Sequence, residues 1–491
     1  MNAYNDIDGQ PCGGSREILD DLLRGELGFE GVVVADYYTT LLLIAWHRVA
    51  ADKGEAAQRA LEAGLDVELP QRDCFGDPLK ERVEADLVSE ELVDRALRRL
   101  LRMKFELGLF EKPTVDADRA PDAYDRPQQV SLARELACKS IVLLENRDDF
   151  LPLDAGIESL AVIGPCADDI RLLQGDYSYP AHVELIYKRP SSDGGEAGDI
   201  RPRSEEVAFA PGPYYRPMVS IVEGIRSAVG PGTEVRTARG CEISGDDASE
   251  IPAAVEAARA SQVAILCVGG KSGLLPEDTS GEFRDASDLG LTGLQQRLVE
   301  EVVATGTPTV VVLVGGRVFA VPWIAEHAIA LLEAWCPGEQ GGHAVADVLF
   351  GASNPAGRLP ISMPHSVGQV PVYYNHRSGS GRSQMLGDYT DGPARPLYPF
   401  GHGLSYTSFD YGELSLSTET PSTSDVVGIA LDVANTGDRD GEEVVQLYLR
   451  DEFASSSRPA KQLAGFVRLA LRAGETRRVT FQLDLSQLGF Y

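Results

Sequence analysis

The sequence has no apolar run long enough to cross a membrane, and it is poor in basic residues. It carries 45 Lys and Arg against 75 Asp and Glu, which gives a net charge of −30. Nucleic-acid binding requires basic patches that attract phosphates, and none stands out here. The first ten residues are polar, unlike a signal peptide. We therefore expect a cytoplasmic protein with an acidic, solvated surface and with no nucleic-acid or membrane partner.

Residue patterns that hold metals, disulfides or phosphates are also missing. The seven cysteines form no CxxC pair, which argues against a zinc site and a disulfide framework, and we expect most of them to be buried free thiols. The seven histidines show no metal-ligand spacing. The stretch "GGKS" at 269–272 resembles the end of a P-loop, but that pattern needs glycine where Ile265 stands. With no GxGxxG either, a nucleotide-binding function is excluded.

The chain divides into parts with different periodicity. Over residues 1–115, strand and helix patterns alternate three times at spacings near 30 residues, which is typical of parallel βα units in a doubly wound sheet or a barrel. The predicted strands are 2–5, 32–35 and 65–69, and the predicted helices are 15–28, 53–64 and 89–110. A polar segment with three prolines, 111–128, predicts a linker.

Residues 129–365 predict a second α/β domain with a largely parallel sheet. Its apolar strand candidates are 160–164, 263–270, 309–316 and 328–335, and helical patterns lie between them, including 291–305 and 342–349. Residues 366–404 form a loop-rich connection. From 405 to 491 the period changes to two, with Val479, Phe481, Leu483 and Leu485 on one face, and this predicts a small β-sandwich.

The stretch "GVVVADYYTT" at 31–40 places a carboxylate, Asp36, where a buried strand should end. An Asp in such a loop is most often the N-cap of the next helix. Active sites of parallel α/β folds, however, lie at the carboxyl ends of strands. The neighbours Tyr37 and Tyr38 offer apolar walls and a hydroxyl donor, which a sugar site needs.

Several motifs along the chain resemble glycoside hydrolase family 3. They are "AYNDIDGQPC", "LLRGELGFEGVVVADYY", "LACKSIVLLENRDDFLPL", "AWCPGEQGGHAVADVLFGASNPAGRLPISMP" and "YPFGHGLSYTSFDY". The resemblance covers nearly all 491 residues. It implies an α/β multidomain fold: the last three βα units of a (β/α)8 barrel, an α/β sandwich domain and an incomplete fibronectin-III-like domain.

The resemblance also implies catalytic roles. The position of the family's nucleophile is Asp36, with Ala35 in place of a family Ser and Tyr37 in place of a family Trp. Retaining glycosidases need a second carboxyl group about 5 Å away. In the family it comes from a loop of the second domain, here 269–291, and the context "SGEFRD" favours Glu282 over Glu277 as the acid/base. Without the resemblance, both glutamates would be read as solvated loop residues.

Three further residues are candidates for substrate binding: Tyr4, Tyr37 and Glu68. The family has a Tyr equivalent to Tyr4 close to the nucleophile, although packing at a barrel rim is an equal alternative. Asp66 and Glu68 share one face of "LDVEL", so Glu68 could accept from a sugar hydroxyl, and a salt bridge inside the barrel is an equal alternative.

The function that follows is a retaining β-glycosidase acting on terminal non-reducing β-D-glucosides or β-D-xylosides, with oligosaccharide or aryl glycoside substrates, no cofactor and no metal. A full barrel needs eight strands, and three βα units precede the second domain here. We therefore expect a chain that lacks part of its barrel, has little activity alone and tends to form homo-oligomers. The alternative is a non-catalytic carbohydrate-binding or scaffold relative.

Overall fold

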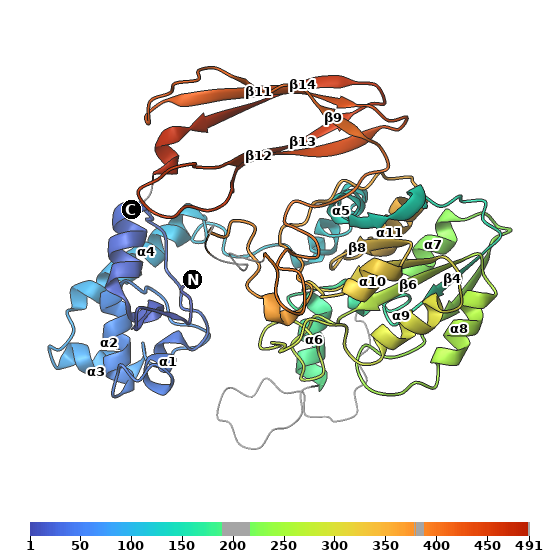
Figure 1. The fold of residues 1–491 in the computed structure, drawn as a ribbon. Coiled ribbons are helices and arrows are strands. Elements are labelled where there is room, and N and C mark those ends of the chain that lie inside the picture. Colours follow the sequence, from blue (N-terminus) through green and yellow to red (C-terminus); the bar gives the residue numbers. More distant parts are fainter. Residues whose placement is uncertain (189–216, 378, 380–386, 490–491) are drawn as a thin grey trace. The chain divides into compact units, whose positions relative to one another are not determined.

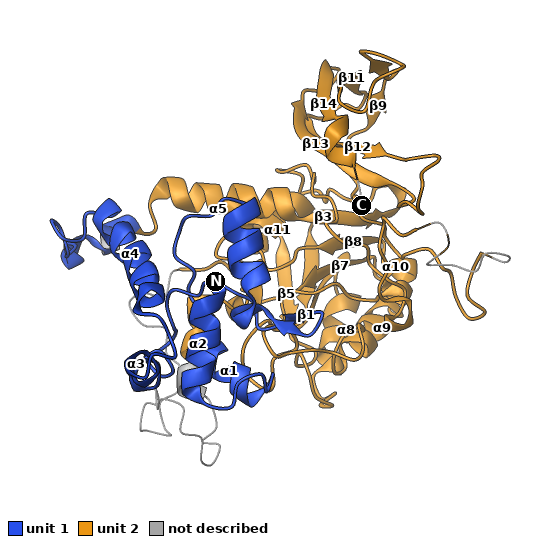
Figure 2. Ribbon diagram, turned by 90° about the vertical axis from the view of Figure 1, so that its left-hand side faces the viewer, with its two compact units in different colours: residues 1–123 blue, residues 124–491 orange. Residues whose placement is uncertain are grey.

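The computed structural model describes residues 1–188, 217–377, 379 and 387–489. The chain forms two compact units, Met1–Ala123 and Tyr124–Tyr491, which are described separately (Figures 1 and 2). All seven cysteines are free thiols and six of them are buried, as predicted. No helix among the described residues has the length and apolar character needed to cross a membrane. The predicted loop connection at 366–404 is described except for 378 and 380–386.

The first unit is mainly helical. Its α-helices are α1 (Thr39–Ala45), α2 (Lys53–Ala63), α3 (Asp77–Glu84) and α4 (Glu90–Glu106), with a π-helix at Glu17–Glu26 and 3-10 turns at Cys12–Gly14, Ala117–Arg119 and Pro121–Ala123. The three predicted helices are confirmed, whereas α1 and α3 were not predicted. Asp52 caps α2 by accepting the Glu55 amide at 2.8 Å, which satisfies a backbone donor that the first turn leaves open.

The predicted strands of this unit are only partly present. The strand predicted over 2–5 is wrong: the chain instead forms a short hairpin of β1 (Asp6–Ile7) and β2 (Gln10–Pro11). The segments predicted as strands at 32–35 and 65–69 are extended and lie parallel, joined by a single bridge between Val34 and Val67. Backbone bonds run from Ala35 N to Val67 O (2.8 Å), from Asp66 N to Val33 O (2.9 Å) and from Tyr38 N to Leu69 O (2.9 Å). Among the described residues of the first unit, this pairing is one isolated bridge and not a longer ladder.

A buried carboxylate holds this parallel pair to the helices. Asp66 accepts from Arg24 Nη2 at 2.7 Å, from Arg99 Nη1 at 2.9 Å and from the Val33 amide at 2.9 Å. Its side chain is 1% exposed, so both guanidinium groups compensate a charge that water does not reach. The salt bridge that the sequence offered as an alternative role for Glu68 is made instead by its neighbour on the same face, Asp66.

The second unit is built on a six-stranded sheet of order β3-β8-β7-β6-β4-β5. Its strands are β3 (Val142–Asn146), β4 (Ser159–Ile163), β5 (Glu234–Ala238), β6 (Val263–Gly269), β7 (Thr309–Val314) and β8 (Ala330–Glu333). Strands β4 to β8 run parallel, and β3 is antiparallel to β8. The four predicted strands and the largely parallel sheet are confirmed.

Helices cover both faces of this sheet (Figure 1). Their bounds are α5 (Pro127–Ser140), α6 (Tyr179–Lys188), α7 (Ile221–Ala228), α8 (Ile251–Arg259), α9 (Gln295–Val303), α10 (Pro322–His327) and α11 (Gly341–Leu349). Short 3-10 helices lie at Arg147–Asp149, Ile170–Leu173, Val367–Gln369 and Leu485–Leu488. In β6, Ile265 and Cys267 pack with the α5, α7 and α11 side, whereas Leu266 and Val268 pack with the α8, α9 and α10 side. Burial on both faces explains why this strand is apolar at every position.

The last part of the second unit is a β-sandwich, as predicted. One sheet contains β10 (Ser415–Leu416), β11 (Val426–Asn435), β14 (Thr476–Asp484) and β9 (Phe409–Tyr411), and the other pairs β12 (Gly441–Leu449) with β13 (Gln462–Leu471). Val479 is buried in its core and Phe481 packs beside it, so the period-two pattern of β14 does mark the inner face.

One buried acid in the sheet makes stability depend on pH. Glu333, at the end of β8, is fully buried, and burial raises its pKa from 4.5 to about 8, although the Trp335 amide donates to it. A carboxyl group with a raised folded-state pKa favours the folded state below its unfolded pKa and loses that contribution as pH rises from about 4.5 to about 8.

We predict that Glu333→Gln removes this pH dependence. By linkage, the free energy of unfolding of the variant relative to the parent should rise by about 3 kcal/mol between pH 4.5 and pH 7. Urea unfolding followed by tryptophan fluorescence at both pH values measures it. Glu326→Gln, on the exposed side of α10, is the control. An unchanged difference at the two pH values would mean that Glu333 is ionised in the folded protein.

Candidate active site

Asp36 lies directly after the extended segment that pairs with residues 65–69. Its Oδ1 accepts the Tyr37 amide at 2.7 Å and lies 3.0 Å from the Tyr4 hydroxyl. The same hydroxyl is 2.7 Å from the Tyr37 carbonyl, so one proton serves two acceptors. No described residue donates to Asp36 Oδ2. Among the described residues, the carboxylate is therefore held through one oxygen only.

The alternative role of Asp36 as a helix cap is wrong. The residue that precedes α1 is Tyr38, and no side chain caps this helix. Tyr38 has φ of +64°, a left-handed conformation that is strained for a residue with a bulky side chain. The Asp36 carbonyl accepts the Thr39 amide at 3.1 Å, which closes the tight turn. The turn directs the chain into α1 without using the Asp36 carboxylate.

Two residues that the sequence did not single out complete these surroundings. Asn2 Oδ1 accepts the Asp36 amide at 3.3 Å, and its Nδ2 donates to Thr39 Oγ1 at 3.1 Å. Trp46 packs edge to face against Tyr4, with ring centres 6.3 Å apart, and is 61% exposed. These two residues are related to Asp36 by their positions in the folded chain and not by a spacing pattern along the sequence. Tyr37 is also more than half exposed, and its role as an aromatic wall stays a prediction.

Glu68 has a structural task in the first unit. Its carboxylate accepts the backbone amides of Asp73, Cys74 and Phe75 at 2.8 to 2.9 Å, which fixes the loop after the extended segment. Three amide donors occupy oxygens that a sugar hydroxyl would need. Contact of Glu68 with substrate stays a prediction, and this geometry favours the structural role.

In the second unit, the sheet order identifies the place where a ligand is expected. The chain passes from β4 to β5 on one side and then returns to β6 on the other side of β4. Ligands of open α/β sheets bind beyond the carboxyl ends of the strands at such a point of reversal. The loops that follow β4 and β6 both begin there, and the second one carries Glu282.

Within these loops Glu282 and Glu277 have different surroundings. Glu282 is half-buried, its Oε2 accepts the Tyr177 hydroxyl at 2.6 Å, and its amide donates to Asp176 Oδ2 at 3.0 Å. Glu277 is exposed and no hydrogen bond joins its carboxylate to a described residue. The surroundings of the two glutamates thus differ, and the choice of Glu282 over Glu277 as acid/base stays a prediction. Asp176 and Tyr177 lie over a hundred residues away from Glu282 in sequence, so no local signal could have identified them.

A buried cluster of charges joins the loop that carries Glu282 to residues that follow β4. Glu184 pairs with Arg171 at 3.0 Å and with Lys271 at 3.2 Å, and Lys271 also pairs with Asp278 at 2.8 Å. All four side chains are at most 16% exposed. The lysine of the "GGKS" stretch therefore serves this cluster. Among the described residues, no group of His, Cys, Asp and Glu is arranged to hold a metal ion.

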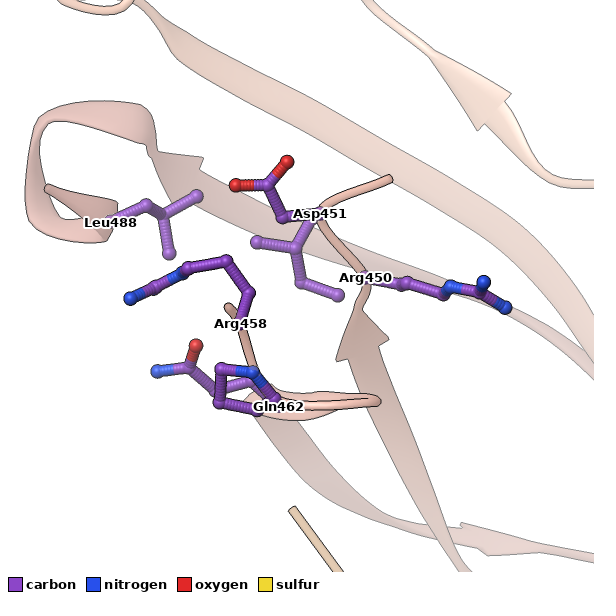
Figure 3. Close-up of a pocket in the computed structure, with 7 residues that line it drawn as sticks. Arg450, Asp451, Arg458, Gln462 and Leu488 are labelled. Atoms are coloured by element: carbon purple, nitrogen blue, oxygen red, sulfur yellow. The ribbon is translucent and has the colours of Figure 1, made fainter. Parts of the chain in front are cut away.

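A separate small pocket lies on the β-sandwich. It has a volume of about 220 Å³ and is lined by Leu449, Arg450, Asp451, Arg458, Pro459, Gln462 and Leu488. Arg458 extends toward Leu488, whereas the guanidinium of Arg450 points away (Figure 3). None of the candidate catalytic residues lines it, so the site is not placed there.

The second unit therefore joins a mostly parallel α/β sheet, with Glu282 in a loop at its switch point, to a β-sandwich. Family profiles agree: the glycosyl hydrolase family 3 N terminal domain matches residues 1–103, its C-terminal domain matches 141–406, and a fibronectin type III-like domain matches 443–491. The chain belongs to glycosyl hydrolase family 3, which confirms the resemblance seen in the motifs.

Curated relatives and solved structures are similar over nearly the whole chain. A β-xylosidase of Formosa agariphila is 37% identical over 99% of this chain and 64% of its own length, and a periplasmic β-glucosidase of Salmonella typhimurium is 34% identical over 100% and 63%. The structure of a β-glucosidase from Erythrobacter marinus matches with a TM-score of 0.83 at 34% identity, covering 99% of this chain and 63% of that one. The chain thus spans less than two thirds of these relatives.

Proposed function

We propose that this chain carries the catalytic carboxylates of a retaining β-glycosidase, with Asp36 as nucleophile and Glu282 as acid/base. The substrates are terminal non-reducing β-D-glucosides or β-D-xylosides in oligosaccharides or aryl glycosides. The names of the relatives, β-xylosidase and β-glucosidase, support this substrate class. We also propose that the protein is cytoplasmic and self-associates, as expected from the sequence.

The observation that carries the proposal is the asymmetric binding of the Asp36 carboxylate. The Tyr4 hydroxyl and the Tyr37 amide fix Oδ1, and no described residue donates to Oδ2. A nucleophile needs an oxygen whose lone pair is directed at the reacting carbon and is not already used by a donor. Donors on Oδ1 also stabilise the carboxylate that leaves when the ester intermediate breaks down.

The reaction proceeds by double displacement. Asp36 Oδ2 attacks the anomeric carbon while Glu282 gives its proton to the leaving oxygen, so the glycosidic bond breaks and a glycosyl ester forms. Glu282, now a carboxylate, takes a proton from water, whose oxygen attacks the same carbon and releases Asp36. Each carboxyl group returns to its starting protonation state, and the sugar keeps its anomeric configuration.

The configuration of the first product tests this proposal. The full-length gene product that contains these 491 residues is incubated with nitrophenyl β-D-glucoside and β-D-xyloside, and the released sugar is followed by proton NMR before mutarotation. We expect the β-anomer to appear first. An α-anomer as first product would contradict double displacement. Binding of sugar without hydrolysis would establish the non-catalytic relative instead.

A further inference from the structure

Two neighbouring residues in the loop after β4 contact Glu282 through different groups. The Asp176 carboxylate accepts the Glu282 amide at 3.0 Å, and the Tyr177 hydroxyl donates to Glu282 Oε2 at 2.6 Å. The first contact fixes the backbone and the second fixes the carboxylate. Both contacts join the loops that follow β4 and β6, at the reversal point of the sheet.

The loop that carries Glu282 is also held by contacts that Ser272, near its start, makes with Asp176 and Arg171. Asp176 Oδ1 lies 3.4 Å from Ser272 Oγ, and the Ser272 carbonyl accepts Arg171 Nη2 at 2.8 Å, within the buried charge cluster. Directly before Glu282, Gly281 has φ of +121°, and a Cβ there would be 2.2 Å from the Gly273 carbonyl oxygen. Only glycine fits this approach of two backbone segments. The contacts of Glu282 with Asp176 and Tyr177 are therefore made from a constrained backbone.

From this geometry we infer that Tyr177 is a positioning residue for Glu282, which holds Oε2 and leaves Oε1 to carry the transferable proton. The inference rests on the proposed function of Glu282. A carboxylic acid that protonates a leaving group needs one oxygen for the proton and gains direction when a donor occupies the other. No described residue donates to Oε1. Tyr177 itself is 71% exposed, and its ring centre lies 5.7 Å from that of His182.

If Tyr177 positions Glu282, its effect on the hydrolysis rate should depend on the leaving group of the substrate. Protonation assists departure most when the leaving oxygen is basic, as in alkyl glycosides and disaccharides, and least for nitrophenolates. Loss of the Tyr177 hydroxyl should therefore affect the first kind and spare the second. A general loss of folding would instead lower the rates of both kinds equally.

The experiment compares Tyr177→Phe with Tyr179→Phe in the full-length gene product. Tyr179 is a second exposed tyrosine in the same stretch, and no hydrogen bond of its hydroxyl to a described residue is present. For Tyr177→Phe we expect kcat/KM to fall about tenfold on a disaccharide and less than threefold on a dinitrophenyl glycoside, as for loss of one hydrogen bond that becomes charge-assisted when Glu282 gives up its proton. Tyr179→Phe should change neither.

Measurements in the Glu282→Ala background distinguish a failure of the role of Tyr177 from a failure of the proposed role of Glu282. With Glu282 absent, Tyr177→Phe should have less than a twofold further effect, because the two residues act as one unit. Equal losses on both substrates, or an undiminished effect in the Glu282→Ala background, would overturn the role of Tyr177. If Glu282→Ala itself shows no dependence on the leaving group, then the proposed function of Glu282 fails first, independently of Tyr177.

Discussion

Replacement of Asp36 by Asn should lower kcat by about 10⁴-fold or more in the full-length gene product, as removal of an enzymatic nucleophile does. An amide cannot form the glycosyl ester, so the first displacement is lost. The geometry should survive, because the Asn oxygen can still accept the Tyr37 amide and the Tyr4 hydroxyl that now bind Oδ1. Steady-state hydrolysis of a nitrophenyl β-glycoside measures the loss.

The control for this variant is Asp94→Asn, which removes an exposed carboxylate of α4 that pairs with Arg98. It should retain turnover within about twofold, as surface substitutions away from a site do. Circular dichroism should show both variants folded. If folded Asp36→Asn kept more than a tenth of the parent turnover, the nucleophile would have to be another residue.

The second large effect is expected for Glu282→Ala, and it should depend on the substrate. Hydrolysis of substrates with basic leaving groups should fall by about 10³-fold, within the range of general acid catalysis, whereas glycosyl transfer from dinitrophenyl glycosides should persist. The ester intermediate then accumulates, because no base activates water. Added azide, which attacks without losing a proton, should restore turnover and yield a glycosyl azide that mass spectrometry detects.

Glu277→Ala is the matched control, since Glu277 lies in the same loop but is exposed. We expect it to show neither azide rescue nor dependence on the leaving group. The reverse pattern, with rescue in Glu277→Ala and none in Glu282→Ala, would exchange the two roles. The contacts that Asp176 and Tyr177 make with Glu282 would then not position the acid/base.

The sequence predicted the second unit better than the first, for a physical reason. Strands such as β6 and β7 are buried on both faces, so their apolar runs follow from local sequence and their neighbours complete the ladders. In the first unit, the segments at 32–35 and 65–69 have strand-like sequences but one neighbour each, and they pair through a few backbone bonds only. The helix α3 was missed because five of its eight residues are charged and no apolar stripe marks it.

Some residues of the candidate site could be identified from the sequence and others could not. Asp36 and Glu282 could be found because each stands in a short motif that resembles a family, although their roles stay predictions. Tyr177 could not be found, since it meets Glu282 through the order of strands in the sheet. Glu68, by contrast, was selected from the sequence because its place on the strand suggested sugar binding. In the structure, three amides of its own loop donate to its carboxylate. Periodicity gives the face of a residue and not its partners.

Covalent trapping tests the central claim most directly. A 2-deoxy-2-fluoro β-glycoside with a dinitrophenyl leaving group slows both displacements but allows the first, so the ester on the nucleophile should accumulate in the full-length gene product. Proteolysis and mass spectrometry then locate the added sugar. We predict that it is found on the peptide that contains "GVVVADYYTT", with fragmentation assigning it to Asp36. A label on any other carboxylate would contradict the account.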